Sequence, residues 1–226
     1  MFGPQDLSKE CRGTWIGVTL KGKFAVLVNF HEAENAEQPF SRGQIPSLYL
    51  QSALDPAEWI EEVKANHKEE LDNCGGFTML FGDIYDDHSS SVYTLSNRSE
   101  TSKLFNDGEP FTIAMSNGYL EDDSWIKVPR IRELVDDLLK VPLEKHRLIE
   151  GLWGVLNNND LATPPTSVDD LRKSIFIPHV NLKDREYGTR TQTIVLFGLD
   201  GSIEYLERDV VTERVTQHLL SRVRSN

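Results

Sequence analysis

An arginine between two threonines stands where an apolar stretch of the sequence begins. Gly188, Thr189, Arg190 and Thr191 directly precede the run QTIVLF. A guanidinium held in a fixed position binds a carboxylate or a phosphate through two parallel hydrogen bonds. An arginine at a strand end can equally extend its charge into solvent while its aliphatic part covers the sheet. The residue types leave both interpretations of Arg190 open.

Two asparagines are the next candidates for contacts with a ligand. Asn29 ends the apolar run FAVLVN, and Asn117 follows a second expected strand, 111–115. A buried amide must have its hydrogen bonds satisfied by the backbone or by a ligand. A structural asparagine that closes the strand is the preferred interpretation of Asn29. Two strands that end in asparagine nevertheless also indicate a shared polar pocket.

Other residues with metal-binding or nucleophilic side chains lack the spacing that such chemistry requires. His31 is followed by glutamates, and aspartates precede His88, but neither group shows paired ligand spacing. Turn-forming aspartates and serines explain the group at His88 better. The two cysteines, Cys11 and Cys74, form neither a zinc motif nor a redox motif. We therefore predict no metal site and assign no catalytic residue.

Two hairpins provide the clearest structural signals. The stretch 187–208 holds two alternating strands around Asp200-Gly201, which is a favoured two-residue hairpin turn. Near the N-terminus, the apolar stretches 14–20 and 24–30 flank a turn at Lys21-Gly22 in the same way. Further strands are expected over 77–84, 92–96, 111–115 and 174–180.

Helices are expected between these strands and after them. Asp55-Pro56 is typical of a helix start, because Asp caps the first turn and proline fits the first helical position. Apolar spacing predicts helices around 48–50, from 56 to about 73, over 129–139, over 142–156 and over 210–224. This order predicts a single α+β domain, residues 1–226, with helices layered on antiparallel sheet.

Composition excludes several classes of protein. A formal net charge of −12 disfavours a nucleic-acid partner or an anionic membrane surface. The longest apolar runs are shorter than the ~20 residues that span a bilayer. Two cysteines suit a reducing compartment, and no import signal is seen, so a cytosolic protein is expected. The first residues lead as a loop into a strand, which suggests that upstream residues are missing.

Four segments together resemble the transport and Golgi organisation family, also called the NRDE proteins. They are GTWIGVTLKGKFAVLVNF, the following SRG at 41–43, MSNG at 115–118, and YGTRTQTIVLFGLDGSIEYLER. Each motif is short, but their order and spacing carry the resemblance from about residue 13 to residue 210. It covers most of the chain.

The resemblance implies the fold of N-terminal-nucleophile hydrolases, two antiparallel sheets between helical layers (αββα). Family members begin with Met-Cys, which exposes a cysteine as nucleophile beside its own amine, and an Asn-Arg-Asp-Glu motif follows. This chain begins Met1-Phe2 and contains neither feature. A nucleophile requires its base nearby. The resemblance therefore implies an N-terminally truncated fold and favours a non-catalytic protein.

Motif positions imply a set of ligand-binding residues with amide, hydroxyl and guanidinium groups: Asn29, Arg42, Asn117, Thr189 and Arg190. Such groups suit a small anionic ligand. The family is implicated in haem trafficking, Golgi organisation, protein secretion and lipid or acyl-CoA metabolism. The resemblance thus makes haem or an acyl-CoA-like molecule the expected cargo. No resident cofactor, oligomeric state or haem axial ligand is assigned.

We therefore expect a non-catalytic cytosolic binding or trafficking protein, with association with the Golgi or with mitochondria as an alternative location. The alternative function is an amide-bond hydrolase of the N-terminal-nucleophile type. Its catalytic cysteine would lie in an upstream extension.

Overall fold

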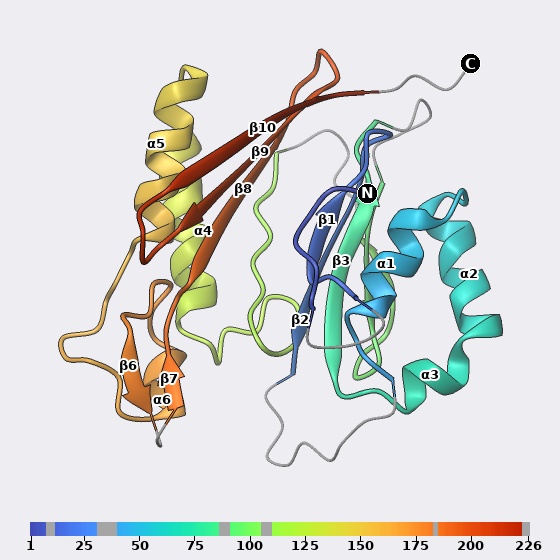
Figure 1. Cartoon of the computed structure of the whole chain (residues 1–226), viewed down its shortest axis with the longest axis horizontal. Coiled ribbons are helices and arrows are strands. Elements are labelled where there is room, and N and C mark those ends of the chain that lie inside the picture. The colour runs from blue at the N-terminus through green and yellow to red at the C-terminus, as the bar shows by residue number, and fades with distance from the viewer. Residues whose placement is uncertain (8–11, 31–39, 86–90, 105–109, 183–184, 223–226) are drawn as a thin grey trace.

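The fold is an assembly of antiparallel sheets and helices (Figure 1). The computed structural model describes residues 1–7, 12–30, 40–85, 91–104, 110–182 and 185–222. Within these ranges, ten strands form sheets of five, three and two strands, and six helices accompany them. The α+β class expected from the sequence is confirmed.

The N-terminal sheet contains the first predicted hairpin and runs in the order β1-β2-β3-β4-β5. Its strands are β1 (Ile16–Val18), β2 (Lys23–Asn29), β3 (Phe77–Asp83), β4 (Ser91–Ser96) and β5 (Ser102–Leu104). Gly22 has a φ of +103°, a conformation that glycine adopts without strain, and it closes the turn between β1 and β2. Phe2 adds an isolated bridge to Val18.

Three helices cover one face of this sheet: α1 (Gln44–Gln51), α2 (Pro56–Asn66) and α3 (Lys68–Asp72). Asp55 caps α2 in a full capping box with Glu58, as its sequence predicts. The single helix expected up to residue 73 is interrupted at His67, whose φ of −126° lies outside the helical region. Tyr49 from α1 and Trp59 from α2 pack edge-on against Phe81 of β3, and all three side chains are buried.

The C-terminal sheet runs in the order β10-β9-β8 and contains the second predicted hairpin. Its strands are β8 (Thr191–Phe197), β9 (Ser202–Asp209) and β10 (Val215–Ser221). The hairpin loop comprises residues 199–201 and is longer than the expected two-residue turn. The N–H of Gly198 donates to the carbonyl of Ser202, and the N–H of Gly201 donates to the carbonyl of Gly198. Gly201 takes a positive φ of +84° there, as in three-residue loops.

The helix expected over 210–224 is wrong, because residues 215–221 form strand β10. Seven consecutive residues of β10 pair with β9, from Val215 opposite Arg208 to Ser221 opposite Ser202. Val215, Leu219 and Leu220, which also fit a helical spacing, instead lie along this strand. Pairing with β9 along the whole strand therefore outweighs the helical preference of the local sequence.

The two larger sheets face each other across a second apolar cluster. Val18 of β1 meets Ile203 and Tyr205 of β9 there, and Phe2 and Phe24 pack against this cluster. The Phe2 ring lies 5.0 Å from the Tyr205 ring and 4.7 Å from the His218 ring, measured between centroids.

Helices α4 (Lys127–Leu139) and α5 (Lys145–Leu156) lie on the far side of the C-terminal sheet (Figure 1). They pack on each other, and α5 contacts β8, as expected for a helix pair on one face of a sheet. The second helix begins at Lys145 rather than at the expected Pro142. The order through the molecule is thus helices, sheet, sheet and helices.

Two of the expected strands do not form. Residues 111–115 make only an isolated bridge between Met115 and Leu120, because the N–H of Ala114 donates to the Glu121 side chain instead. Residues 174–179 also lack strand structure. A small hairpin of β6 (Val180–Leu182) and β7 (Arg185–Tyr187) follows them, after the short α6 (Val168–Leu171). Among the described residues, no helix has the length and apolarity needed to cross a membrane.

Candidate functional site

A cavity of about 660 Å³ opens where β1 and β8 begin and β9 ends. This volume lies within the range of ~300–1,000 Å³ that is usual for small-molecule sites. The N-terminal segment, the start of β1 and the two strands of the C-terminal hairpin supply its walls. The lining residues are Pro4, Gln5, Asp6, Leu7, Trp15, Ile16, Arg190, Thr191, Thr193 and Glu207.

Charged side chains of both signs line this cavity. Arg190 is the cation among its described lining residues, and Asp6 and Glu207 are the carboxylates. Arg190 is exposed, so its guanidinium remains accessible from solvent. A ligand there would place an acceptor such as a carboxylate or phosphate on Arg190. The two carboxylates favour hydrogen-bond donors elsewhere on the same head group.

An apolar slot of about 380 Å³ continues from the cavity between the two sheets. Ile16 and Thr193 line both spaces, so the cavity and the slot adjoin. The slot is lined by Ile16, Gly17, Val18, Phe24, Val26, Ile84, Thr193, Val195 and Phe197. The combined site therefore has a polar, charged entrance and an apolar interior, an arrangement that suits an amphipathic molecule.

Thr189 and the Arg190 backbone fasten the start of β8. The N–H of Thr189 donates to the carbonyl of Ile177 at 2.8 Å, and Thr189 Oγ1 accepts the N–H of Ile177 at 2.9 Å. The carbonyl of Arg190 accepts the N–H of Val210 at 2.9 Å. Thr189 thus acts in the structure as a backbone anchor that fixes where the Arg190 side chain begins.

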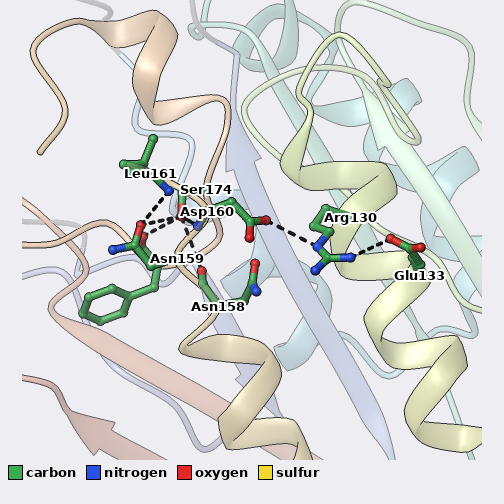
Figure 2. Close-up of polar contacts among 8 residues, drawn as sticks. Arg130, Glu133, Asn158, Asn159, Asp160, Leu161 and Ser174 are labelled. Carbon is green, nitrogen blue, oxygen red and sulfur yellow. Dashed lines mark hydrogen bonds and ion pairs between the residues drawn. The ribbon is translucent and has the colours of Figure 1, made fainter. Parts of the chain in front are cut away.

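Ser174 holds the segment that carries Ile177, and Figure 2 shows its contacts with the loop at residues 158–160. Its side chain is fully buried, and its hydroxyl accepts the N–H of Asp160 at 3.2 Å and lies 2.9 Å from the carbonyl of Phe176. Asp160 also forms an ion pair with Arg130 of α4, with Nε and Oδ2 3.3 Å apart. Through these contacts α4 and the loop after α5 support the backbone at Ile177, to which Thr189 is hydrogen-bonded.

Gln192 ties β8 to the end of α5. Its Nε2 donates to the carbonyl of Leu156 at 2.7 Å and to Asn157 Oδ1 at 3.1 Å. Its Oε1 accepts Nε of Arg208 at 2.9 Å, and Nη2 of Arg208 also donates to it. The Arg208 guanidinium stacks over the Trp153 ring at 4.4 Å. Gln192 points to the helices, while its neighbour Thr193 faces the cavity.

Tyr205 is buried in the apolar cluster between the two sheets. The side chain is 2% exposed, and its hydroxyl lies near the side chains of Thr193 and Glu207, which line the cavity. Burial, with a smaller contribution from the Glu207 carboxylate, raises the pKa of Tyr205 to about 12 from its usual value of 10.0. The folded protein therefore disfavours the phenolate.

We expect this hydroxyl to make the protein sensitive to alkali. A phenol whose pKa is raised on folding stabilises the fold fully below pH ~10, and this contribution is lost as the pH rises through ~12. The wild-type protein should lose about 2–3 kcal/mol of unfolding free energy in this interval relative to Tyr205→Phe. Urea unfolding at a series of pH values measures this difference. Tyr187→Phe, at an exposed tyrosine, should follow the wild type, and a Tyr205→Phe curve parallel to the wild type would contradict the assignment.

The other three residues expected at the site gather at the end of β2. The Gly76 carbonyl accepts both the N–H of Phe30 at 2.8 Å and Nη1 of Arg42 at 2.9 Å, which brings Arg42 beside Asn29. Asn29 ends β2 as expected, and its buried Oδ1 has no hydrogen-bond partner among the described residues. Asn117 is exposed in the loop after the bridge at Met115.

Asn117 belongs to the same neighbourhood as Asn29. The adjoining Gly118 carbonyl accepts the hydroxyl of Thr78, and the Tyr119 ring lies 4.8 Å from the Phe30 ring. The structure therefore brings Asn29, Arg42 and Asn117 to one end of the N-terminal sheet. It places Thr189 and Arg190 separately, at the start of β8 in the other sheet.

Sequence reasoning missed most of the cavity. Trp15, Asp6 and Glu207 were not singled out, although each contributes to the lining together with Arg190. Strand alternation offered a signal, because Thr191, Thr193 and Val195 share one face of β8. No sequence pattern, however, indicated that this face meets the N-terminal segment.

The described part of the chain offers no metal site or activated thiol. No group of three or more His, Cys, Asp or Glu residues that could hold a metal occurs there. His31, His88 and Cys11 lie outside the described residues. Cys74 is buried and donates to the Leu71 carbonyl, and burial raises the pKa of its thiol to about 11. Cys74 is therefore a neutral thiol at physiological pH, unsuited to nucleophilic attack.

Comparison with known proteins gives a consistent result along most of the chain. The sequence profile described as Transport and Golgi organisation 2 matches residues 1–212. The mouse protein "Transport and Golgi organization 2 homolog" is 27% identical over 207 residues, which cover 88% of this chain and 72% of the relative. The human protein "Transport and Golgi organization protein 2 homolog" shows the same values. An uncharacterized protein of Saccharomyces cerevisiae is 23% identical over 247 aligned positions, covering 92% and 79%.

Proposed function

The chain belongs to the Transport and Golgi organisation 2 family, and from this premise we propose that it is a non-catalytic binding or trafficking protein for a small amphipathic molecule. The observation that carries the proposal is the charged cavity at Arg190 and its continuation as an apolar slot. An anionic head group would lie at Arg190, and an apolar body would enter between the sheets. The family's description supports a role connected with transport and the Golgi. Our proposal is that the protein performs this role in the cytosol.

The layering of the fold supports this site. We propose that the order helices, sheet, sheet and helices corresponds to the αββα arrangement of N-terminal-nucleophile hydrolases. A site between the two sheets, bordered by the N-terminal segment, agrees with that correspondence. The chain would then use a hydrolase-like fold for binding.

Haem is the first candidate for the cargo, and an acyl-CoA-like thioester is the second. Both join an apolar body to carboxylate or phosphate groups, which suit Arg190. The described residues that line the cavity and the slot include no His, Cys, Met or Tyr, the side chains that usually bind haem iron. Haem would therefore be held by its apolar ring and its propionates.

Titration with hemin and, separately, with a long-chain acyl-CoA tests the proposal. We expect saturable binding of one of them, seen as a Soret shift for hemin or as heat in calorimetry for the thioester. Arg190→Ala should weaken that binding about tenfold, equivalent to about 1.4 kcal/mol, because it removes a charged hydrogen bond. Arg147→Ala, at an exposed arginine of α5, is the matched control and should bind as the wild type does.

The outcomes of this experiment separate the candidate functions. Failure of both ligands to saturate, or unchanged affinity in Arg190→Ala, would overturn the proposed site. Mass spectrometry of the recovered thioester distinguishes binding from catalysis. Intact thioester supports a carrier, whereas hydrolysed thioester would contradict the proposed non-catalytic role.

A further inference from the structure

Strand β10 forms an exposed edge of the C-terminal sheet. It pairs with β9 on one side, and six of its seven residues are exposed. Val215 is 48% exposed and Leu219 is 68% exposed, so the strand presents apolar side chains as well as its backbone. An exposed strand of this length can accept another strand as its neighbour.

The hydrogen-bond pattern shows which residues offer their backbone groups at the free edge. The N–H of Asp209 donates to the carbonyl of Arg214, and the N–H of Arg222 donates to the carbonyl of Gly201. In an antiparallel ladder such bonded positions alternate with positions whose N–H and C=O point the other way. Val215, Gln217, Leu219 and Ser221 therefore direct their backbone groups away from β9.

The edge lacks the usual protection against strand pairing. Natural edge strands carry lysines, prolines or bulges that prevent the addition of another strand. The β10 sequence VTQHLLS contains no charged residue and no proline, although 27% of the whole chain is charged. Charged residues stand just outside it, at Arg214 and Arg222. Strand β10 is therefore a short uncharged segment between two arginines.

We propose that β10 pairs antiparallel with β10 of a second copy of this chain, across a two-fold axis at Gln217. In this register Val215 of one copy lies opposite Leu219 of the other, so the two exposed apolar side chains cover each other. Arg214 lies opposite Leu220. The two C-terminal sheets join into one continuous sheet.

Charge and symmetry favour this occupant and this register. The neighbouring symmetric register, centred on His218, would place Arg214 opposite Arg222, and like charges opposite each other are unfavourable. A two-fold interface uses the same patch on both partners. The neutral strand β10 can form such a patch, because the proposed register keeps the flanking arginines of the two copies apart. The pairing leaves the cavity at Arg190 on the opposite edge strand, β8.

Sedimentation velocity over a series of concentrations tests the pairing. We expect a monomer–dimer equilibrium with a dissociation constant on the order of 10–100 µM, because a single strand ladder is a small interface. Leu219→Lys should raise this constant at least about tenfold, because it places a lysine in the ladder. Leu199→Lys, a matched change at the exposed tip of the β8–β9 hairpin, should dimerise as the wild type does.

A second variant and a second readout identify the edge itself. Gln217→Pro removes an N–H that points to the free edge, so it should retain the β9 ladder and abolish dimerisation. Amide hydrogen exchange at Val215, Gln217 and Leu219 should slow only at concentrations where the dimer forms. A protein that stays monomeric throughout, or a dimer unaffected by both variants, would overturn the proposal.

Discussion

Phe81→Ala is expected to lower the free energy of unfolding by about 3–5 kcal/mol, the largest effect among our predictions. Phe81 is fully buried, and its ring contacts the rings of Tyr49 and Trp59 at centroid distances of 4.8 and 5.2 Å. Removing the ring leaves a cavity between β3 and the helices α1 and α2, which cannot close because each neighbour is held by its own element. The loss is a large share of the ~5–15 kcal/mol that usually separates folded from unfolded domains.

Urea unfolding followed by far-ultraviolet circular dichroism measures this loss as a lower midpoint with an unchanged slope. The matched control is Phe111→Ala, at a phenylalanine that is 48% exposed and should change the unfolding free energy by less than about 1 kcal/mol. Equal midpoints for the two variants would show that the aromatic cluster does not form the core described above.

Gln192→Leu is expected to cost about 2–4 kcal/mol, although leucine resembles glutamine in size. The change removes the acceptor for two N–H groups of Arg208 and the donor to the Leu156 carbonyl. Hydrogen bonds to a charged group contribute about 1.5–3 kcal/mol each, and a buried group left without a partner bears its full desolvation cost. Gln192 is 4% exposed, so water cannot replace the lost contacts.

Thermal and urea unfolding of Gln192→Leu measure this cost. Gln51→Leu makes the same change at the exposed last residue of α1 and should lie within about 0.5 kcal/mol of the wild type. Unaltered stability in Gln192→Leu would mean that α5 and β8 are held together by apolar contacts alone.

Features set by neighbouring residues could be predicted from the sequence. The β1–β2 and β8–β9 hairpins depend on local turns and alternation, and the Asp55 cap depends on contacts within four residues. Strand β10 could not be predicted in this way, because its partner β9 decides its conformation. Its apolar residues fit either periodicity until that partner is known.

The same distinction between local and long-range information applies to the residues of the candidate site. Arg190 could be singled out from its type and its place before a strand. The carboxylates of Asp6 and Glu207 could not, because they come from segments about 200 residues apart that meet only when the two sheets pack. The apolar slot depends on which faces of β1 and β8 oppose each other, and that information is not local.

The contacts of Phe2 with Tyr205 and His218 have a consequence for synthesis of the protein. The first residues of the chain cannot reach their native neighbours until the last strand has left the ribosome. At about 5–20 residues per second, this wait lasts on the order of 10–40 s. The helices α1 to α3 and the N-terminal sheet can assemble earlier, with the inner face of that sheet uncovered. Complete closure of the two sheets therefore has to wait for β10, and the nascent chain exposes apolar surface until that strand is available.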